Sequence, residues 1–122
     1  MATASEIFAH HLEAFGAGDI EEILTDYSEN SVMMYGAHVW RGLAGARAFF
    51  EMWMDGLLPP GCRFDLIDSQ TSDDMVYITW TAESDDYVFD YGTDTFVMRD
   101  SKILRQTVAT LHRKKEGGAH QK

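Results

Sequence analysis

The sequence predicts an α+β fold in which helices come first and a sheet follows. Two observations predict it. Apolar residues in the first half recur at the three- and four-residue spacing of amphipathic helices, whereas those in the second half alternate with polar residues as in half-buried strands. This order is typical of an antiparallel sheet with helices covering one face. At 122 residues and 45% hydrophobic composition, the chain fits one domain with a full hydrophobic core.

Three helices are expected ahead of the main sheet, and each is recognised by its caps and its apolar stripe. Thr3 or Ser5 can cap the first helix, which ends near Gly16. Asp19 can cap a short second helix that runs to about residue 26. The third helix ends at Gly56, before a Pro-Pro-Gly break. The three apolar stripes consist of Ile7, Phe8, Leu12 and Phe15, then Ile20, Ile23 and Leu24, then Ala46, Phe49, Phe50, Trp53 and Leu57.

Strands are expected on both sides of the third helix. A short strand pair precedes it and a meander of up to four strands follows it. We expect residues 1–113 to form a single domain and residues 114–122, which are basic and contain two glycines, to form a flexible tail. The expected strands are Ser31–Tyr35, His38–Arg41, Arg63–Ser69, Met75–Ser84, Tyr87–Arg99 and Lys102–Arg113.

A carboxylate in the Tyr87–Arg99 strand is the most informative residue of the chain. Side chains alternate along a strand, so Asp94 is expected on the same face as Phe96, Met98, Gly92 and Asp90. Phe96 and Met98 require a dry interior, where an acid must find a partner or keep its proton. Asp94 is therefore either a structural acid or a pocket acid with a raised pKa that can donate a proton or a hydrogen bond.

His11 lies on the apolar stripe of the first helix, so it should face the interior. A histidine in such a place is either a core residue or a functional one. The functional interpretation requires that His11 reach Asp94, because an Asp–His pair would orient the imidazole and make it a candidate base. His10 is expected to point elsewhere, since adjacent helical residues diverge.

Several large side chains can either fill the core or line a cavity. As a set they predict that a ligand of such a cavity is mainly apolar or aromatic, with Gln106 as a hydrogen-bonding group at the wall. No motif predicts a cofactor, and the five histidines lack the spacing of metal ligands. The candidate wall residues are Met33, Tyr35, Trp40, Trp53, Trp80, Phe96 and Met98.

Charge and cysteine content limit the partners and the location. A net charge of -10 argues against nucleic acid or an anionic membrane as the main partner. The single cysteine, Cys62, suits a reducing cytoplasm, and the chain shows neither a signal peptide nor an apolar run that could span a bilayer. The last strand has a semi-polar face that either packs against a second copy in a homodimer, the interpretation we favour, or is merely solvated. That face consists of Ile103, Arg105, Thr107, Ala109 and Leu111, beside Thr93, Thr95 and Val97.

The order of elements, together with three short motifs, resembles the nuclear-transport-factor-2-like superfamily in its SnoaL-like branch. The motifs are the Ala-Gly-Asp after the first helix, residues 41–47 at the entry to the third, and residues 92–96 with Lys102-Ile103. The resemblance covers residues 5–113 and implies a cone-shaped curved antiparallel sheet, covered by three N-terminal helices, around a pocket. The superfamily includes ketosteroid isomerases, epoxide hydrolases, polyketide cyclases, scytalone dehydratases and members that only bind.

The resemblance also suggests where functional residues would lie. In ketosteroid isomerase a tyrosine and a protonated aspartic acid form an oxyanion hole, and a second aspartate is the base. Their places match His11, Asp94 and Met33, so this chain should not catalyse that isomerisation. Three possibilities stay open: a module that binds a small apolar or aromatic molecule, a cofactor-free isomerase, dehydratase, cyclase or hydrolase that moves protons with Asp94 and His11, and a filled cone that serves only dimerisation.

Overall fold

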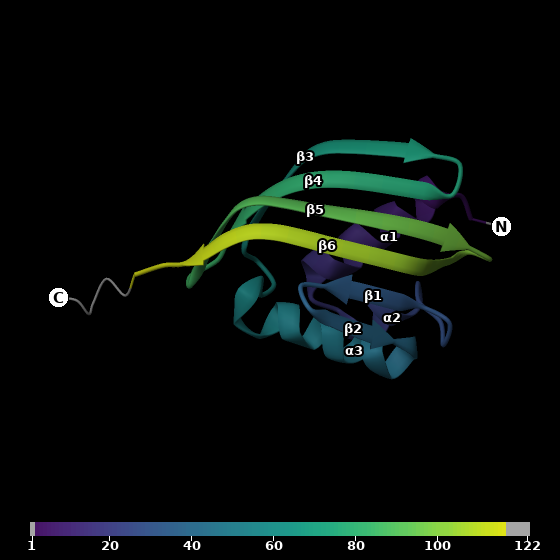
Figure 1. The fold of residues 1–122 in the computed structure, drawn as a ribbon, viewed down its shortest axis with the longest axis horizontal. Coiled ribbons are helices and arrows are strands. Elements are labelled where there is room, and N and C mark those ends of the chain that lie inside the picture. The colour runs from purple at the N-terminus through teal and green to yellow at the C-terminus, as the bar shows by residue number, and fades with distance from the viewer. Residues whose placement is uncertain (1, 117–122) are drawn as a thin grey trace.

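A computed structural model describes residues 2–116, and it confirms the α+β fold (Figure 1). Helices occupy the N-terminal half and a six-stranded sheet the rest. No helix in this part of the chain is long and apolar enough to cross a membrane. The elements are α1 (Ala4–Ala17), α2 (Ile20–Leu24), β1 (Val32–Tyr35), β2 (His38–Arg41), α3 (Gly42–Met52), the π-helical turn η1 (Trp53–Leu57), β3 (Arg63–Ser72), β4 (Met75–Glu83), β5 (Tyr87–Arg99) and β6 (Lys102–Lys114).

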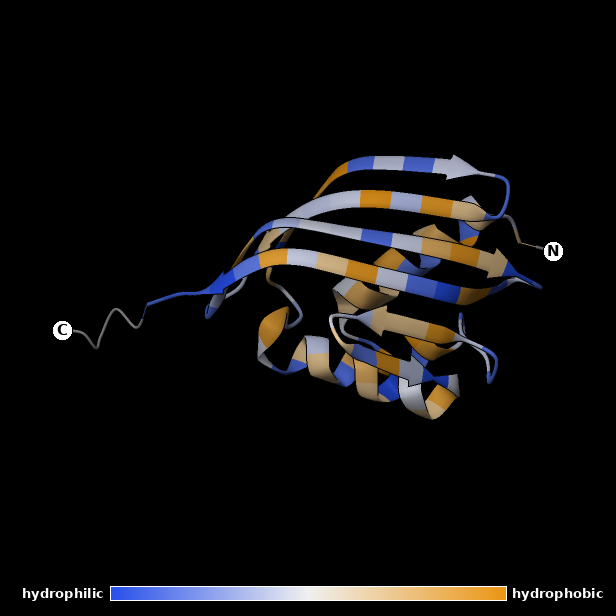
Figure 2. Cartoon of the chain, in the orientation of Figure 1, coloured by the Kyte–Doolittle hydropathy of each residue, from blue (hydrophilic) through white to orange (hydrophobic). Residues whose placement is uncertain are grey.

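The sheet is curved, and the helices pack against one of its faces (Figure 1). Its strand order is β2-β1-β6-β5-β4-β3. All neighbours are antiparallel except β1 and β6, which are parallel, so the expectation of a wholly antiparallel sheet is wrong at this pair. A parallel pair needs a long crossover, and here α3 and four strands lie between β1 and β6. Hydrophobic and hydrophilic residues alternate along the long strands (Figure 2), as expected for a sheet with one buried face.

The helix caps follow the predicted residues closely. Thr3 caps α1: its side chain accepts a hydrogen bond from the Glu6 amide, and Glu6 accepts one from the Thr3 amide at 2.8 Å. The helix ends at Gly18, in the left-handed conformation at φ 68°, two residues beyond the predicted Gly16. Asp19 caps α2 by accepting a hydrogen bond from the Glu22 amide at 3.1 Å.

Two β-bulges move residues to faces that alternation does not predict. The pairing of β5 with β6 shifts register between Phe89 and Tyr91 and again between Val97 and Met98. Asp90 therefore leaves the predicted face of Asp94, lies exposed, and accepts a hydrogen bond from Arg113 at 3.3 Å. The second shift turns Ile103 into the core, although simple alternation places it on the outer face.

The C-terminal strand is longer than expected. β6 continues to Lys114, one residue into the predicted tail. The next residue, Lys115, is also held, because its amide donates to the carbonyl of Asp86 at 2.7 Å and its ammonium lies 2.7 Å from a Glu83 carboxylate oxygen. Residues 117–122 of the predicted tail lie outside the described residues.

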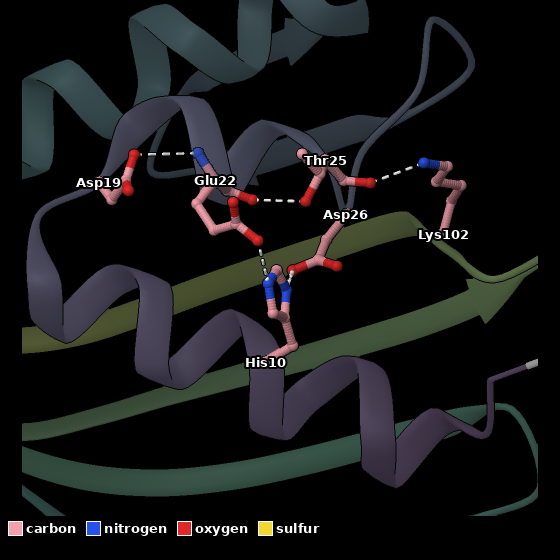
Figure 3. A network of polar contacts seen from close by, with 6 residues as sticks. All are labelled: His10, Asp19, Glu22, Thr25, Asp26 and Lys102. Atoms are coloured by element: carbon pink, nitrogen blue, oxygen red, sulfur yellow. Dashed lines mark hydrogen bonds and ion pairs between the residues drawn. The ribbon is translucent and has the colours of Figure 1, made fainter.

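A polar cluster around His10 connects α1 to α2 (Figure 3). The two ring nitrogens of His10 lie 2.6 Å from carboxylate oxygens of Asp26 and Glu22, one on each side. Beside them, the ammonium of Lys102 on β6 donates to the Thr25 carbonyl at 2.6 Å. The cluster thus joins α1 and α2 and lies against the start of the last strand.

Replacing His10 with alanine is expected to lower the free energy of unfolding at pH 6 by about 1 kcal/mol, because solvent weakens ion pairs of a histidine that is 34% exposed. Hydrogen bonds to Asp26 and Glu22 raise the pKa of His10. Its stabilisation is therefore complete below the ordinary histidine pKa and is lost as pH rises through the raised value. Urea unfolding should show a smaller loss at pH 9 than at pH 6. The exposed His38→Ala serves as control, and equal losses for His10→Ala at both pH values would refute this role.

Candidate functional site

Asp94 lies near the middle of β5, with its side chain buried on the inner face of the sheet. The indole Nε1 of Trp80 donates to one carboxylate oxygen at 2.8 Å, and the amide Nε2 of Gln106 donates to the other at 2.9 Å. Both donors come from the flanking strands, at positions diagonal to Asp94 in the registers of β4 and β6. The sheet register thus supplies one donor to each oxygen of a buried acid.

The network continues through Tyr27, which lies in the segment that follows α2. The Tyr27 hydroxyl donates to the Oε1 atom of Gln106, so Tyr27, Gln106, Asp94 and Trp80 form one chain of buried hydrogen bonds. Gln106 was predicted from the sequence at the cavity wall, whereas Tyr27 was not among the predicted site residues. The two residues are 79 positions apart, and no local pattern joins them.

Burial raises the pKa of Asp94 to about 6, while the hydrogen bonds from Trp80 and Gln106 oppose that rise. Asp94 is therefore mostly ionised at pH 7 and accepts hydrogen bonds through both oxygens. The resemblance implied a protonated acid at this place. A carboxylate with a pKa near 6 is instead suited to accept a hydrogen bond or a proton.

His11 lies in an aromatic cage and is only 5% exposed. Its ring centroid is 5.4–6.4 Å from those of Phe15, Tyr27, Phe50 and Phe96. Burial lowers its pKa to about 4, with a smaller contribution from nearby His10, so the imidazole is neutral at pH 7. Its Nδ1 atom is buried without a hydrogen-bond partner.

Asp94 and His11 face the same small cavity, whose volume is about 50 Å³. No hydrogen bond joins them within residues 2–116, so the Asp–His pair that would orient the imidazole is not formed directly. The cavity wall is otherwise mostly aromatic and aliphatic. Of the predicted site residues, Asp94, His11, Trp53, Trp80, Phe96 and Gln106 line it.

The other four predicted wall residues lie outside this cavity. Met33, in the place that the resemblance gave to a base, is fully buried, and Met98 is also in the core. The Tyr35 hydroxyl lies 2.8 Å from the Thr110 hydroxyl. Trp40 packs edge-on against Phe49, with ring centroids 4.9 Å apart. Alternation and helical spacing predict that a side chain is buried, but they do not show whether it lines the cavity or packs in the core.

The end of the third helix contributes two wall residues through an unusual turn. Beyond α3 the amide of Leu58 donates to the carbonyl of Trp53 at 2.7 Å, five residues back, which is a π-type hydrogen bond. Gly56 permits this turn with φ 103°. Trp53 and Leu58 therefore both reach the cavity. Such π-turns occur at the C-termini of helices, and the sequence predicts only a helix end here.

Within residues 2–116, no group of three or more histidine, cysteine, aspartate or glutamate side chains is arranged to hold a metal ion. The polar groups of the cavity wall belong to Asp94, His11, Trp80 and Gln106. They are a carboxylate, a neutral imidazole, an indole N–H and a carboxamide.

The sequence profile of SnoaL-like domains matches residues 8–106, a stretch that contains every polar residue of the cavity. The chain belongs to the SnoaL-like domain family. This confirms the resemblance inferred from the order of elements. None of the curated proteins matches the sequence.

Several solved structures share the fold of this chain at low sequence identity. A nuclear transport factor 2-like protein from Burkholderia xenovorans has a TM-score of 0.74 at 15% identity, covering 94% of this chain and 88% of that one. A ketosteroid isomerase-like protein from Erwinia carotovora atroseptica has a TM-score of 0.62 at 15% identity, with 89% and 94% covered. A candidate polyketide cyclase from Sinorhizobium meliloti has a TM-score of 0.69 at 12% identity, with 84% and 92% covered. At such identities the likeness establishes the fold.

Proposed function

We propose that this SnoaL-like domain binds a small, neutral, mainly apolar or aromatic molecule that carries a hydrogen-bond donor for Asp94. One observation carries the proposal: the Asp94 carboxylate and the unpartnered Nδ1 of His11 are both buried at the wall of one aromatic cavity. Buried polar atoms are almost always hydrogen-bonded, so an unpartnered one beside a cavity needs an explanation. A polar group of a ligand would supply the missing partner.

The charge and hydrogen-bonding capacity of Asp94 define the kind of ligand. An ionised carboxylate has about four acceptor positions, and Trp80 and Gln106 occupy two of them. A hydroxyl or N–H group can use a remaining position. A ligand carboxylate would instead be repelled, because like charges interact strongly where water is excluded. The aromatic wall suits the apolar remainder of the molecule.

Matched ligands and matched variants test this proposal. Titration of tryptophan fluorescence, which Trp53 and Trp80 at the wall should report, compares 4-propylphenol with its methyl ether, 4-propylanisole. We expect the phenol to bind about tenfold or more tightly, because only it can donate to a charged acceptor. Asp94→Asn should remove most of that difference, whereas Asp90→Asn, at an exposed acid of the same strand, should keep it. Equal binding of both ligands to the unaltered protein, or no binding, would overturn the proposal.

Catalysis is the alternative that the pKa of Asp94 favours. A general base is most effective when its pKa lies near the working pH, and Asp94 has a pKa of about 6. It could remove a proton next to a carbonyl while His11 supplies a hydrogen bond. Exchange of the acidic C–H protons of 2-tetralone for deuterium in D₂O should then be about 100-fold slower in Asp94→Asn than in the unaltered protein. Identical exchange rates in Asp94→Asn and the unaltered protein would contradict catalysis by Asp94 and favour binding as the function.

We also propose that two copies associate through the outer face of the sheet. Tyr91 and Leu111 are paired across β5 and β6 on that face, and they are 49% and 66% exposed. Met34 and Tyr77 are exposed as well, and threonines occupy much of the space between. Light scattering is expected to give the mass of a dimer, and Leu111→Glu to give that of a monomer with unchanged circular dichroism. A monomeric unaltered protein at 100 µM would contradict this assembly.

A further inference from the structure

We propose that the ligand site continues from the cavity at Asp94 into a second, larger apolar chamber, so that the ligand is a compact polar group carrying an apolar tail. This inference rests on the proposed function and adds the shape of the ligand. The second chamber is a surface pocket of about 300 Å³, partly open to solvent, between the end of α1, the loop after η1 and the start of β3. No charged side chain lines it.

The volumes show why a second chamber is needed. An apolar protein cavity that accommodates benzene has a volume of about 150 Å³. The cavity at Asp94 and His11, at about 50 Å³, is too small for an aromatic ring. It has room for a polar group and the atoms next to it, so an aromatic ring attached to that group would take the place of the side chains that now form the cavity wall. The rest of the ligand must therefore lie beyond the present wall, and the second chamber is within the size range of small-molecule sites.

A single layer of side chains separates the two spaces. Leu12, Phe15, Leu58 and Phe64 line both of them. Leu12 and Phe15 are one turn apart on α1, and Leu58 and Phe64 come from the segment that follows η1. All four are apolar and form no side-chain hydrogen bonds, so changes of rotamer would cost only packing contacts. Changes at Leu12 and Leu58 alone would join the chambers without moving Phe64, which stacks on the Trp80 indole of the Asp94 network.

The loop that lines the outer chamber is anchored at the C-terminal cap of α1. A Cβ atom on Gly18 would lie 2.2 Å from Cγ of Pro60, so the proline ring packs directly on the glycine backbone. Close by, the Cys62 amide donates to the Pro59 carbonyl at 3.2 Å and folds the loop into a turn. The backbone around the chamber is therefore fixed, and we assign the opening to side chains that the two spaces share, Leu12 and Leu58 first.

The first test fills the outer chamber from Gly16, which lines it. A Cβ atom there would have no neighbour within 4 Å. Affinities are measured for 4-methyl-, 4-propyl- and 4-hexylphenol. In the unaltered protein each added methylene should raise affinity about fourfold, equivalent to ~0.8 kcal/mol. Gly16→Phe should weaken 4-hexylphenol more than tenfold and 4-methylphenol less than threefold, while Gly16→Ala should change neither by as much as threefold.

The second test uses the unaltered protein. Cys62 is the one cysteine of the chain and lines the outer chamber. Saturating 4-hexylphenol should slow its alkylation by N-ethylmaleimide at least fivefold, whereas saturating 4-methylphenol should not. If affinity did not depend on the length of the alkyl chain of the phenol, or if both phenols protected Cys62 equally, the proposal of a second chamber would be wrong. If Asp94→Asn still weakens all three phenols, the proposed function survives. Failure of every phenol to bind would overturn both.

Discussion

Replacing Gly92 with alanine is expected to lower the free energy of unfolding by about 3 kcal/mol or more, because it combines overpacking with a lost hydrogen bond. A Cβ atom at Gly92 would lie 2.3 Å from the Trp80 indole. That indole cannot simply move aside, since it stacks on Phe64 at 5.2 Å and packs against Phe89 at 5.6 Å. Displacing it would also break its hydrogen bond to Asp94.

Urea unfolding of Gly92→Ala measures this effect, and Gly16→Ala is the matched control. Gly16 lies in α1, and a Cβ atom there meets nothing within 4 Å. Its replacement by alanine should leave stability unchanged or raise it by up to about 1 kcal/mol. If Gly92→Ala were as stable as the unaltered protein, the close packing of Trp80 on β5, and with it the described shape of the cavity, would be wrong.

Asp94 and His11 should give stability opposite dependences on pH. The pKa of Asp94 is raised from 3.8 to about 6, so its folded form holds a proton that the unfolded chain releases. Its stabilising contribution is complete below pH 3.8 and is lost as pH rises through 6. The pKa of His11 is lowered from 6.5 to about 4, so its contribution is present above pH 6.5 and is lost as pH falls through 4.

Differences between variants separate the two contributions. Urea unfolding at pH 4.5 and pH 7 is compared for the unaltered protein, Asp94→Asn and His11→Phe. From pH 4.5 to pH 7, the free energy of unfolding of the unaltered protein should fall by about 2 kcal/mol relative to that of Asp94→Asn. Relative to that of His11→Phe, it should rise by about 2 kcal/mol. A difference from either variant that does not change with pH would mean that the corresponding group is not buried as described.

Much of the fold follows from local patterns in the sequence. Thr3 and Asp19 cap the helices because their side chains reach amides only a turn away. Alternation along Tyr87–Arg99 predicts the buried positions of Asp94, Phe96 and Met98. These features depend on neighbours in the chain, so a single sequence is enough to place them.

Features that depend on distant partners were not predictable. The bulges that move Asp90 outward and Ile103 inward arise from the pairing of β5 with β6. The bond from Tyr27 to Gln106 depends on how α2 meets the sheet. Helical and strand periodicity likewise cannot show that Trp53 lines the cavity while Trp40 does not, since both patterns predict only an inward-facing side chain.

The pH dependence of ligand affinity tests most directly whether the Asp94 carboxylate anchors a ligand. Binding of 4-propylphenol is measured between pH 4.5 and pH 8 for the unaltered protein and Asp94→Asn. We predict that affinity for the unaltered protein rises with pH around a midpoint near 6 and levels off above pH 7, as the acid ionises, while Asp94→Asn shows no such rise. Binding that is independent of pH in both proteins, or that rises equally in both, would contradict this role of Asp94.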